Sequence, residues 1–211
     1  MNRGVIASLR DFVPIRSLTR EEALRIAELQ ARRFHELVGA MSPPFSERLI
    51  TDLPRVQVER MSPIPVSGST HWASNKWLIV LNGAESRARQ RFSLAHEFKH
   101  ILDHRFIDIL YEGVAAHDRA RWIEQVCDYF AGCLLMPRPW VKRAYANGNQ
   151  QLASLADRFE VSQAAMNYRL IQIGLIDQPA RCSRLRPGWS LRDTPVAGTP
   201  YYQRTPGLVA T

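Results

Sequence analysis

The 211-residue sequence has no apolar run that approaches the roughly 20 residues of a membrane-spanning helix. Residues 1–14 also lack the apolar core of a secretory signal peptide. We therefore expect a cytoplasmic protein. No segment repeats another, so the chain is not expected to be an array of stacked repeats.

Cysteine is scarce, and the chain has three: Cys127, Cys133 and Cys182. Their spacing matches no paired cysteine metal motif. An odd number of cysteines in a cytoplasmic protein favours reduced thiols over disulfides. Cys127 and Cys133 lie in a segment with a helical pattern, where we expect them to pack rather than to act as ligands or nucleophiles.

Acidic residues are outnumbered by lysine and arginine, 20 against 28, and the formal net charge is +8. Clustered basic side chains neutralise phosphates, so this excess is compatible with nucleic-acid binding. Hydrophobic residues make up 45% of the chain, enough for one good core and a small additional module. From residue 178 onward, recurrent prolines and arginines predict irregular structure.

The most informative feature is the string His96-Glu97-Phe98-Lys99-His100, inside a segment with the periodicity of an amphipathic helix. Histidines four residues apart lie on one helix face, so both can bind a single Zn²⁺. Glu97 follows the first histidine, which suits its carboxylate to act as general base on a water molecule at the metal. The string predicts metal-assisted hydrolysis of a peptide bond. The alternative is a solvated helix with two surface histidines.

A catalytic zinc usually has three protein ligands and one open position, so a third ligand must come from elsewhere in the chain. The downstream candidates are His104, Glu112, His117, Glu124 and Asp128. His104 is too distant, since a rise of ~1.5 Å per residue places it about 12 Å along the helix axis from His96. Glu112 and His117 fall in a segment that reads as a loop or a frayed helix end.

Glu124 is the preferred third ligand. It lies in a strongly helical segment, residues 119–136, with Asp128 one turn further on the same face. The Asp128 carboxylate can hold the free ring nitrogen of a zinc-bound histidine and so fix its tautomer. The alternative is that both residues are ordinary exposed acids.

The segments before the histidine string predict a small sheet. Residues 56–59 read as a strand, and residues 71–77 read as a hairpin that continues into the apolar run 77–81. We expect the last of these strands, next to the metal-bearing helix, to be where an extended substrate adds by backbone pairing. Asn82 and Glu85 have the spacing of a capping box, so we expect that helix to begin at Asn82.

A long amphipathic helix is expected over residues 19–39, capped by Thr19 with Glu22. Its apolar stripe is broken only by Gln30.

Residues 152–159 and 163–172 resemble the two helices of a helix-turn-helix, the second capped by Ser162. The turn position that often holds glycine is Glu160. The side chains of the second helix that can read bases are Gln163, Asn167, Tyr168 and Arg169, and only one of them is cationic. We therefore favour a helical module that packs on the rest of the chain or contacts a helix-turn-helix partner, over one that reads DNA by itself.

Residues 89–100, which end in the histidine string, and residues 124–137 together resemble the ImmA/IrrE family of bacterial zinc peptidases. The likeness spans about residues 15–175. In that family two histidines and a downstream glutamate hold zinc and the intervening glutamate is catalytic. The resemblance carries these roles over to His96, His100, Glu124 and Glu97.

The chain departs from the usual family sequence motif at Val126 and Cys127, where an acidic residue and an alanine are common. Val126 leaves no carboxylate there to compete with Glu124. The resemblance also implies the substrate class: similar members cleave or inactivate a transcriptional repressor, often one encoded beside them on mobile DNA, or a repressor of a DNA-damage response.

The expected fold is α+β. Residues 1–140 are expected to form a zincin-like metallopeptidase domain, in which a small antiparallel or mixed sheet accompanies the HExxH helix and the glutamate-bearing helix. Residues 141–177 are expected to form the helix-turn-helix-like module, and residues 178–211 the irregular tail.

Two functions stay open at this point. The first is a zinc-dependent endopeptidase that cleaves a DNA-binding repressor with Glu97 as general base. The second is a DNA-associated transcriptional regulator or a toxin–antitoxin component, in which the zinc site is structural or inactive. Glu97 favours the first, because a structural site needs no carboxylate there and usually has cysteine ligands. Two histidines and a carboxylate suit Zn²⁺ but also accept Mn²⁺ or Fe²⁺.

Overall fold

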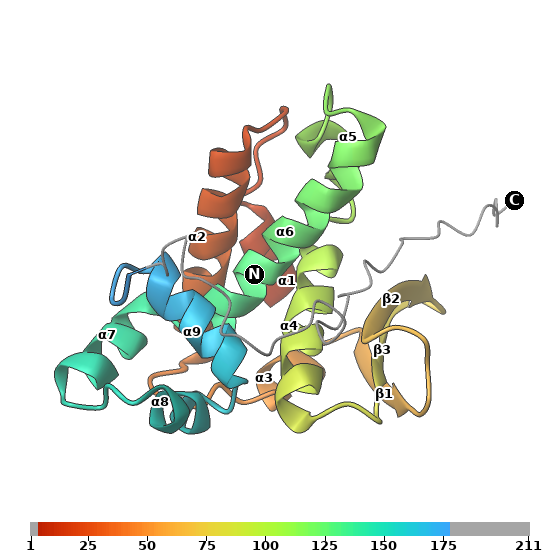
Figure 1. Ribbon diagram of the computed structural model, residues 1–211. Coiled ribbons are helices and arrows are strands. Elements are labelled where there is room, and N and C mark those ends of the chain that lie inside the picture. The colour runs from red at the N-terminus through yellow and green to blue at the C-terminus, as the bar shows by residue number, and fades with distance from the viewer. Residues whose placement is uncertain (1–3, 178–211) are drawn as a thin grey trace, which may run out of the picture. The chain divides into compact units, whose positions relative to one another are not determined.

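A computed structural model describes residues 4–177 of the chain (Figure 1). The elements follow in the order α1 (Val5–Arg10), α2 (Arg20–Val38), α3 (Arg48–Thr51), β1 (Val56–Met61), β2 (Gly68–Ala73), β3 (Lys76–Asn82), α4 (Arg87–Asp103), α5 (Ile107–Leu110), α6 (Ala116–Leu135), α7 (Arg138–Ala146), α8 (Leu152–Phe159) and α9 (Gln163–Gln172). The mixture of one small sheet with many helices confirms the predicted α+β class. The predicted irregular tail, residues 178–211, lies outside the described residues. Within the described residues, no helix is long and apolar enough to cross a membrane.

The sheet has the strand order β1-β3-β2, with β1 parallel and β2 antiparallel to the central strand. The predicted hairpin joins β2 to β3 through Ser74 and Asn75, both of which have positive φ. The expectation that the last strand offers its edge to a substrate is wrong, because β3 is paired along both sides. Its side chains are buried alternately, which suits a central strand. Within the sheet, the open edge next to α4 belongs to β2.

Helix α4 begins four residues later than the sequence predicted. Asn82 is still part of β3, and its Oδ1 accepts a hydrogen bond from the amide of Ala84 at 3.0 Å, which forms a turn. The helix cap is Ser86, whose Oγ accepts from the amide of Arg89 at 3.3 Å. Asn82 cannot serve as the cap because its backbone remains paired in the sheet, opposite Met61 of β1.

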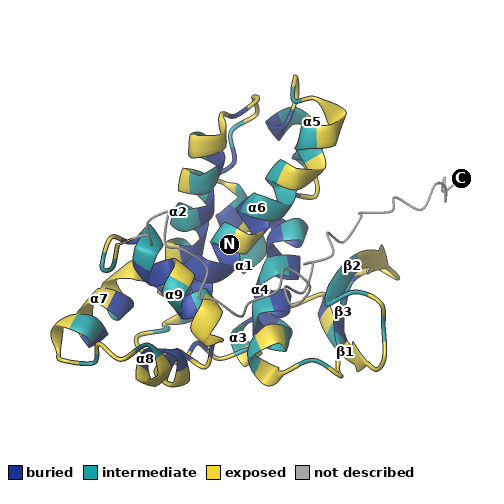
Figure 2. Ribbon diagram, viewed as in Figure 1, coloured by how far each residue is buried: buried dark blue, intermediate teal, exposed yellow. Residues whose placement is uncertain are grey.

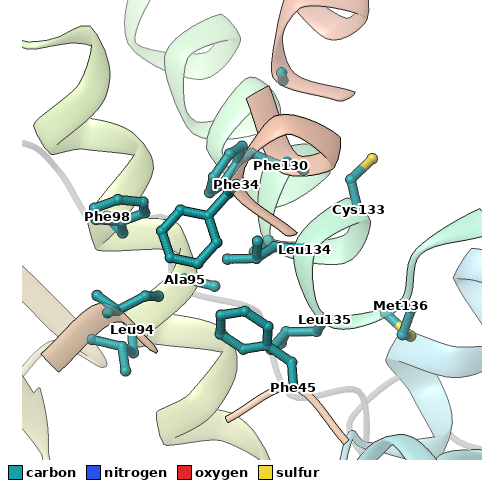
Figure 3. Packing of buried hydrophobic residues seen from close by; sticks show 14 of the residues in the cluster. Phe34, Phe45, Leu94, Ala95, Phe98, Phe130, Cys133, Leu134, Leu135 and Met136 are labelled. Atoms are coloured by element: carbon teal, nitrogen blue, oxygen red, sulfur yellow. The ribbon is translucent and has the colours of Figure 1, made fainter. Parts of the chain in front are cut away.

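Helix α4 lies between the sheet and α6, and α2 packs along the other side of α6 (Figure 1). The faces that these three helices turn toward one another are buried (Figure 2). Phe34 of α2 is central to this core, with ring centroids 5.4 Å from Phe98 of α4 and 5.8 Å from Phe45 (Figure 3). Phe98 in turn lies 6.3 Å from Phe130 of α6. The aromatic contacts hold the two helices of the predicted metal site against a common core.

Helix α2 has the predicted capping box, in which Thr19 and Glu22 exchange side-chain and backbone hydrogen bonds. Gln30 does not break its buried stripe, since it is itself fully buried. Its amide nitrogen donates to the carbonyl of Leu9 at 3.0 Å, and its Oε1 accepts from Lys99 Nζ at 2.7 Å. Burial of this polar side chain is possible because both ends of its amide are hydrogen-bonded.

Lys99, inside the histidine string, is buried beneath the metal-bearing face of α4. Its Nζ lies 2.6 Å from Asp103 Oδ1 and 5.9 Å from the centre of the Phe130 ring. With the bond to Gln30, these contacts make a buried polar cluster that joins α2, α4 and α6. A lysine at this place in the string was not predicted to be buried.

Residues up to Ile176 form one compact unit, and the expected boundary at residue 140 falls inside α7. The turn between α8 and α9 contacts the start of α4 through Arg91. The Arg91 guanidinium donates to the carbonyl of Glu160 at 3.1 Å, lies 3.2 Å from its carboxylate, and donates to the carbonyl of Phe45 at 2.8 Å. Glu160, at the position where glycine is common, has a left-handed conformation with φ of 52°.

Helices α8 and α9 form the predicted pair, and Ser162 caps α9 by accepting from the amide of Ala165 at 3.1 Å. The interpretation of Arg169 as a base-reading side chain is wrong, because it is buried. Its Nε donates to the carbonyl of Met136 at 3.0 Å, and its guanidinium lies 5.9 Å from the centre of the Tyr129 ring. Arg169 was the only cation of α9, so this helix exposes none.

Candidate metal centre

Two histidines of α4 and one glutamate of α6 converge where these helices pack together. The Nε2 atoms of His96 and His100 lie 3.1 Å apart. Glu124 places Oε2 at 3.2 Å from His96 Nε2 and Oε1 at 3.5 Å from His100 Nε2. Three potential donors from two helices therefore face one another.

The spacing of these donors fits a tetrahedral zinc site. With Zn–N and Zn–O bonds of ~2.0–2.1 Å, two ligands at a tetrahedral angle are ~3.3–3.4 Å apart. The two histidine nitrogens are 3.1 Å apart, and each lies 3.2 or 3.5 Å from a different oxygen of Glu124, so these distances are of the same size. Two imidazole nitrogens at this distance can form an N–H···N hydrogen bond or can both bind one metal ion.

Asp128, one turn after Glu124 on α6, holds the other nitrogen of the first histidine. Its Oδ1 lies 2.8 Å from His96 Nδ1. A carboxylate there accepts the Nδ1–H bond, fixes the ring orientation and leaves Nε2 as the metal-facing donor. The structure thus has the expected contact between Asp128 and a ring nitrogen of His96, and the role of Asp128 beside a metal ion stays a prediction.

The electrostatics of the metal-free cluster favour the charged form of each partner. Burial disfavours imidazolium, yet the hydrogen bonds to Asp128 and Glu124 outweigh burial and raise the pKa of His96 above its usual value. Burial likewise opposes ionisation of Glu124, but its hydrogen bonds to His100 and His96 lower the pKa of its carboxyl. Binding of a metal ion at Nε2 would therefore require charged His96 to lose a proton.

The carboxylate of Glu97 is buried against strand β2 rather than free in solvent. The hydroxyl of Thr70 donates to Glu97 Oε2 at 2.7 Å. A Cβ atom added to Gly68 would lie 3.0 Å from Glu97 Cγ and 3.1 Å from Oε1. Neither β2 residue was predicted to belong to the site, since nothing local marks them. Only the register of the hairpin over α4 brings them there.

Residues 54–171, more than half of the chain, match the family described as the IrrE N-terminal-like domain, a family of peptidases. The chain belongs to this IrrE-like family. The chain is also 31% identical over 101 residues to the radiation response metalloprotease IrrE of Deinococcus radiodurans. That match covers 45% of this chain and 31% of the relative, so the chain spans about a third of its length.

A solved structure supports the fold of this IrrE-like chain. A transcriptional regulator of Mycobacterium tuberculosis superposes with a TM-score of 0.58 over 84% of this chain and 54% of that protein. At 15% sequence identity, the likeness concerns the fold alone.

Cys127 competes with Glu124 for the third ligand position of the IrrE-like site. Its thiol and one nitrogen each from His96 and His100 lie within 4.8 Å of one another. Burial raises the pKa of this thiol well above its usual value, which opposes the thiolate that binds metal. Each Glu124 oxygen lies within 3.5 Å of a histidine ring nitrogen, so we prefer the carboxylate as the candidate ligand.

Two other candidates weighed from the sequence are engaged elsewhere. The ring of His104, which follows the last residue of α4, packs against Trp77 with centroids 4.9 Å apart. His117 is exposed in the first turn of α6, which begins earlier than predicted, and pairs with Asp118 at 3.1 Å. It lies about 10 Å along that helix from Glu124, at ~1.5 Å per residue.

Proposed function

We propose that this protein is a zinc-dependent endopeptidase in which His96, His100 and Glu124 hold the metal and Glu97 is the general base. The observation that carries this proposal is the convergence of His96, His100 and Glu124, whose nitrogen and oxygen atoms approach to 3.1–3.5 Å, with a further carboxylate on the residue next to His96. A structural zinc site would not need the carboxylate of Glu97. Membership of a peptidase family supports the same reaction.

Bound Zn²⁺ would polarise the scissile carbonyl and lower the pKa of a water molecule to about 7. Glu97 accepts a proton from the attacking water through its carboxylate and then passes that proton to the departing amine nitrogen. Asp128 keeps the ring of His96 in the orientation that leaves Nε2 free for the metal.

We propose that the substrate binds as an extended strand along the open edge of β2. An added antiparallel strand is the usual way in which a sheet edge recognises a peptide. In this fold β2 has its other edge paired with β3 and contacts α4 directly, so a peptide on the open edge would run past Glu97. Trp72 is half exposed near the end of β2 and can contact the peptide.

The proposed substrate is a protein, and specifically a DNA-binding repressor. The relative named a radiation response metalloprotease supports a regulatory role. The surface of α9 supports a protein contact, since it exposes Tyr168 and no cation. DNA binding by the helix pair itself is not favoured, because phosphate contacts need exposed lysine or arginine.

The test is Glu97→Gln, which is expected to retain one zinc per chain while cleavage falls by about 10²- to 10⁴-fold, the usual contribution of a general base. The inactive variant also serves as a trap: we expect it to co-purify with an uncut protein that the parent cleaves, and mass spectrometry of the fragments gives the scissile bond. His117→Ala, an exposed histidine outside the cluster, is the matched control and should cut at the parental rate.

Two results would overturn the proposal: Glu97→Gln that cuts as fast as the parent, or a parent chain that binds no zinc. A salt titration of DNA binding addresses the regulator alternative, because sequence-specific affinity for an operator would favour it.

A further inference from the structure

The Glu97 carboxylate is positioned by an element distant in sequence, the edge strand β2. Its Oε2 accepts the Thr70 hydroxyl at 2.7 Å, and the same hydroxyl lies 3.4 Å from the Glu97 carbonyl oxygen. The hydrogen bond fixes one carboxylate oxygen. It leaves the other oxygen, Oε1, to be placed by packing alone.

Gly68 supplies that packing surface. It lies two residues before Thr70, so both face the same side of β2. An added Cβ would come within 3.0 Å of Glu97 Cγ and 3.1 Å of Oε1, closer than ordinary van der Waals contact. Gly68 is not among the residues with positive φ, so the need for glycine here comes from space rather than from backbone conformation.

We propose that Gly68 and Thr70 are positioning residues that together fix the rotamer of the general base, an inference that rests on the peptidase function proposed above. Thr70 holds one oxygen by a hydrogen bond, and the bare backbone at Gly68 lets the side chain of Glu97 lie flat against the strand. The base is then oriented before substrate arrives, so no reorganisation is needed during the reaction.

The location of these residues ties substrate binding to the base. Of the two edge strands, β2 is the one that contacts α4, so the element that would pair with the substrate backbone also sets the position of Glu97. The distance between the scissile bond and the base would therefore depend on the direct contact between β2 and α4.

The test uses Thr70→Val, which keeps the shape and removes the hydroxyl, Thr70→Ser, which restores it, and Gly68→Ala. Ser69→Ala is the control, since that hydroxyl faces the other side of β2, 3.2 Å from His71. The assay is steady-state hydrolysis of a peptide that spans the scissile bond found with the Glu97→Gln trap. Zinc affinity is measured by chelator competition, and crystal structures of the zinc-loaded variants show where the carboxylate lies.

We expect Thr70→Val and Gly68→Ala to lower kcat by about 10- to 100-fold, the effect of misplacing a catalytic group by a fraction of an ångström to 1 Å. KM and zinc affinity should stay parental, Thr70→Ser should recover most of kcat, and the Glu97 carboxylate should be displaced in the two impaired variants.

A parental kcat in both Thr70→Val and Gly68→Ala, or an unmoved carboxylate, would overturn the inference. So would a Thr70→Val variant that loses zinc or unfolds while Gly68→Ala is normal, because the role of Thr70 would then be structural. If the parent binds zinc and cuts nothing while the variants displace Glu97, the proposed function fails and the positioning role stands.

Discussion

Asp103→Ala removes the anionic partner of a buried lysine, and we expect it to lower the free energy of unfolding of the metal-free protein by about 3–5 kcal/mol. The side chains of Lys99 and Asp103 are 2% and 5% exposed, and their charged atoms are 2.6 Å apart. Without Asp103 the ammonium keeps only the neutral Gln30 oxygen and the face of Phe130. Water cannot replace the lost carboxylate at a site so deeply buried.

The assay is urea denaturation of the metal-free parent and variant at pH 7, monitored by circular dichroism. The free energy of unfolding is extrapolated linearly to zero urea. The matched control is Asp108→Ala. Asp108 likewise pairs with a basic side chain, that of Arg119 at 2.7 Å, but Asp108 is 81% exposed. Its replacement should therefore lower the free energy of unfolding by less than about 1 kcal/mol. Equal losses for the two variants, or a loss below about 1 kcal/mol for Asp103→Ala, would refute the reasoning.

Four further outcomes are expected. Asp128→Ala should weaken zinc binding about 10- to 100-fold in chelator competition, because the ring of His96 loses its fixed orientation. Cys127→Ser should bind zinc as tightly as the parent does. A large loss of zinc affinity in Cys127→Ser would identify the thiol as the ligand in place of Glu124. In the metal-free protein, the pKa of His96 is raised from 6.5, so its contribution to stability is complete below pH 6.5 and is lost as pH rises through the folded value. The pKa of Glu124 is lowered from 4.5, so its contribution is present above pH 4.5 and is lost as pH falls toward the folded value. The difference in free energy of unfolding between the parent and Glu124→Gln should therefore be largest between pH 4.5 and pH 6.5. A difference that does not vary with pH would contradict this. Thr19→Ala should cost about 1 kcal/mol in urea denaturation through loss of the capping box, and no measurable loss would mean that the cap is redundant.

Local signals explain why much of the fold could be predicted from the sequence. The Thr19 cap, the hairpin at Ser74-Asn75 and the Ser162 cap each depend on residues within a few positions of one another. The start of α4 was mispredicted although its signal is local, because Asn82 and Ser86 both suit a helix cap. The choice between them depends on how far β3 stays paired with β1, which is a tertiary contact.

The candidate site divides in the same way. The histidine pair and its neighbouring glutamate follow from helical spacing alone. The buried Lys99, the hydroxyl of Thr70 and the space at Gly68 could not be predicted, because each depends on which distant element packs on α4. Arg169 was misplaced for the same reason, since an arginine in a helix sequence gives no sign that its guanidinium will cap the carbonyl of Met136.

The contacts between Arg91 and Glu160, in the turn before α9, determine where the chain can be truncated without loss of stability. Arg91 belongs to the metal-bearing helix, is nearly inaccessible, and relies on Glu160 for both a carbonyl and a carboxylate contact. A fragment that stopped at residue 140 would strip these contacts from a guanidinium that cannot lose its charge. The turn at Glu160 therefore supports the helix that carries the histidines, and we expect a fragment that ends at residue 140 to be less stable than one that includes α8 and this turn.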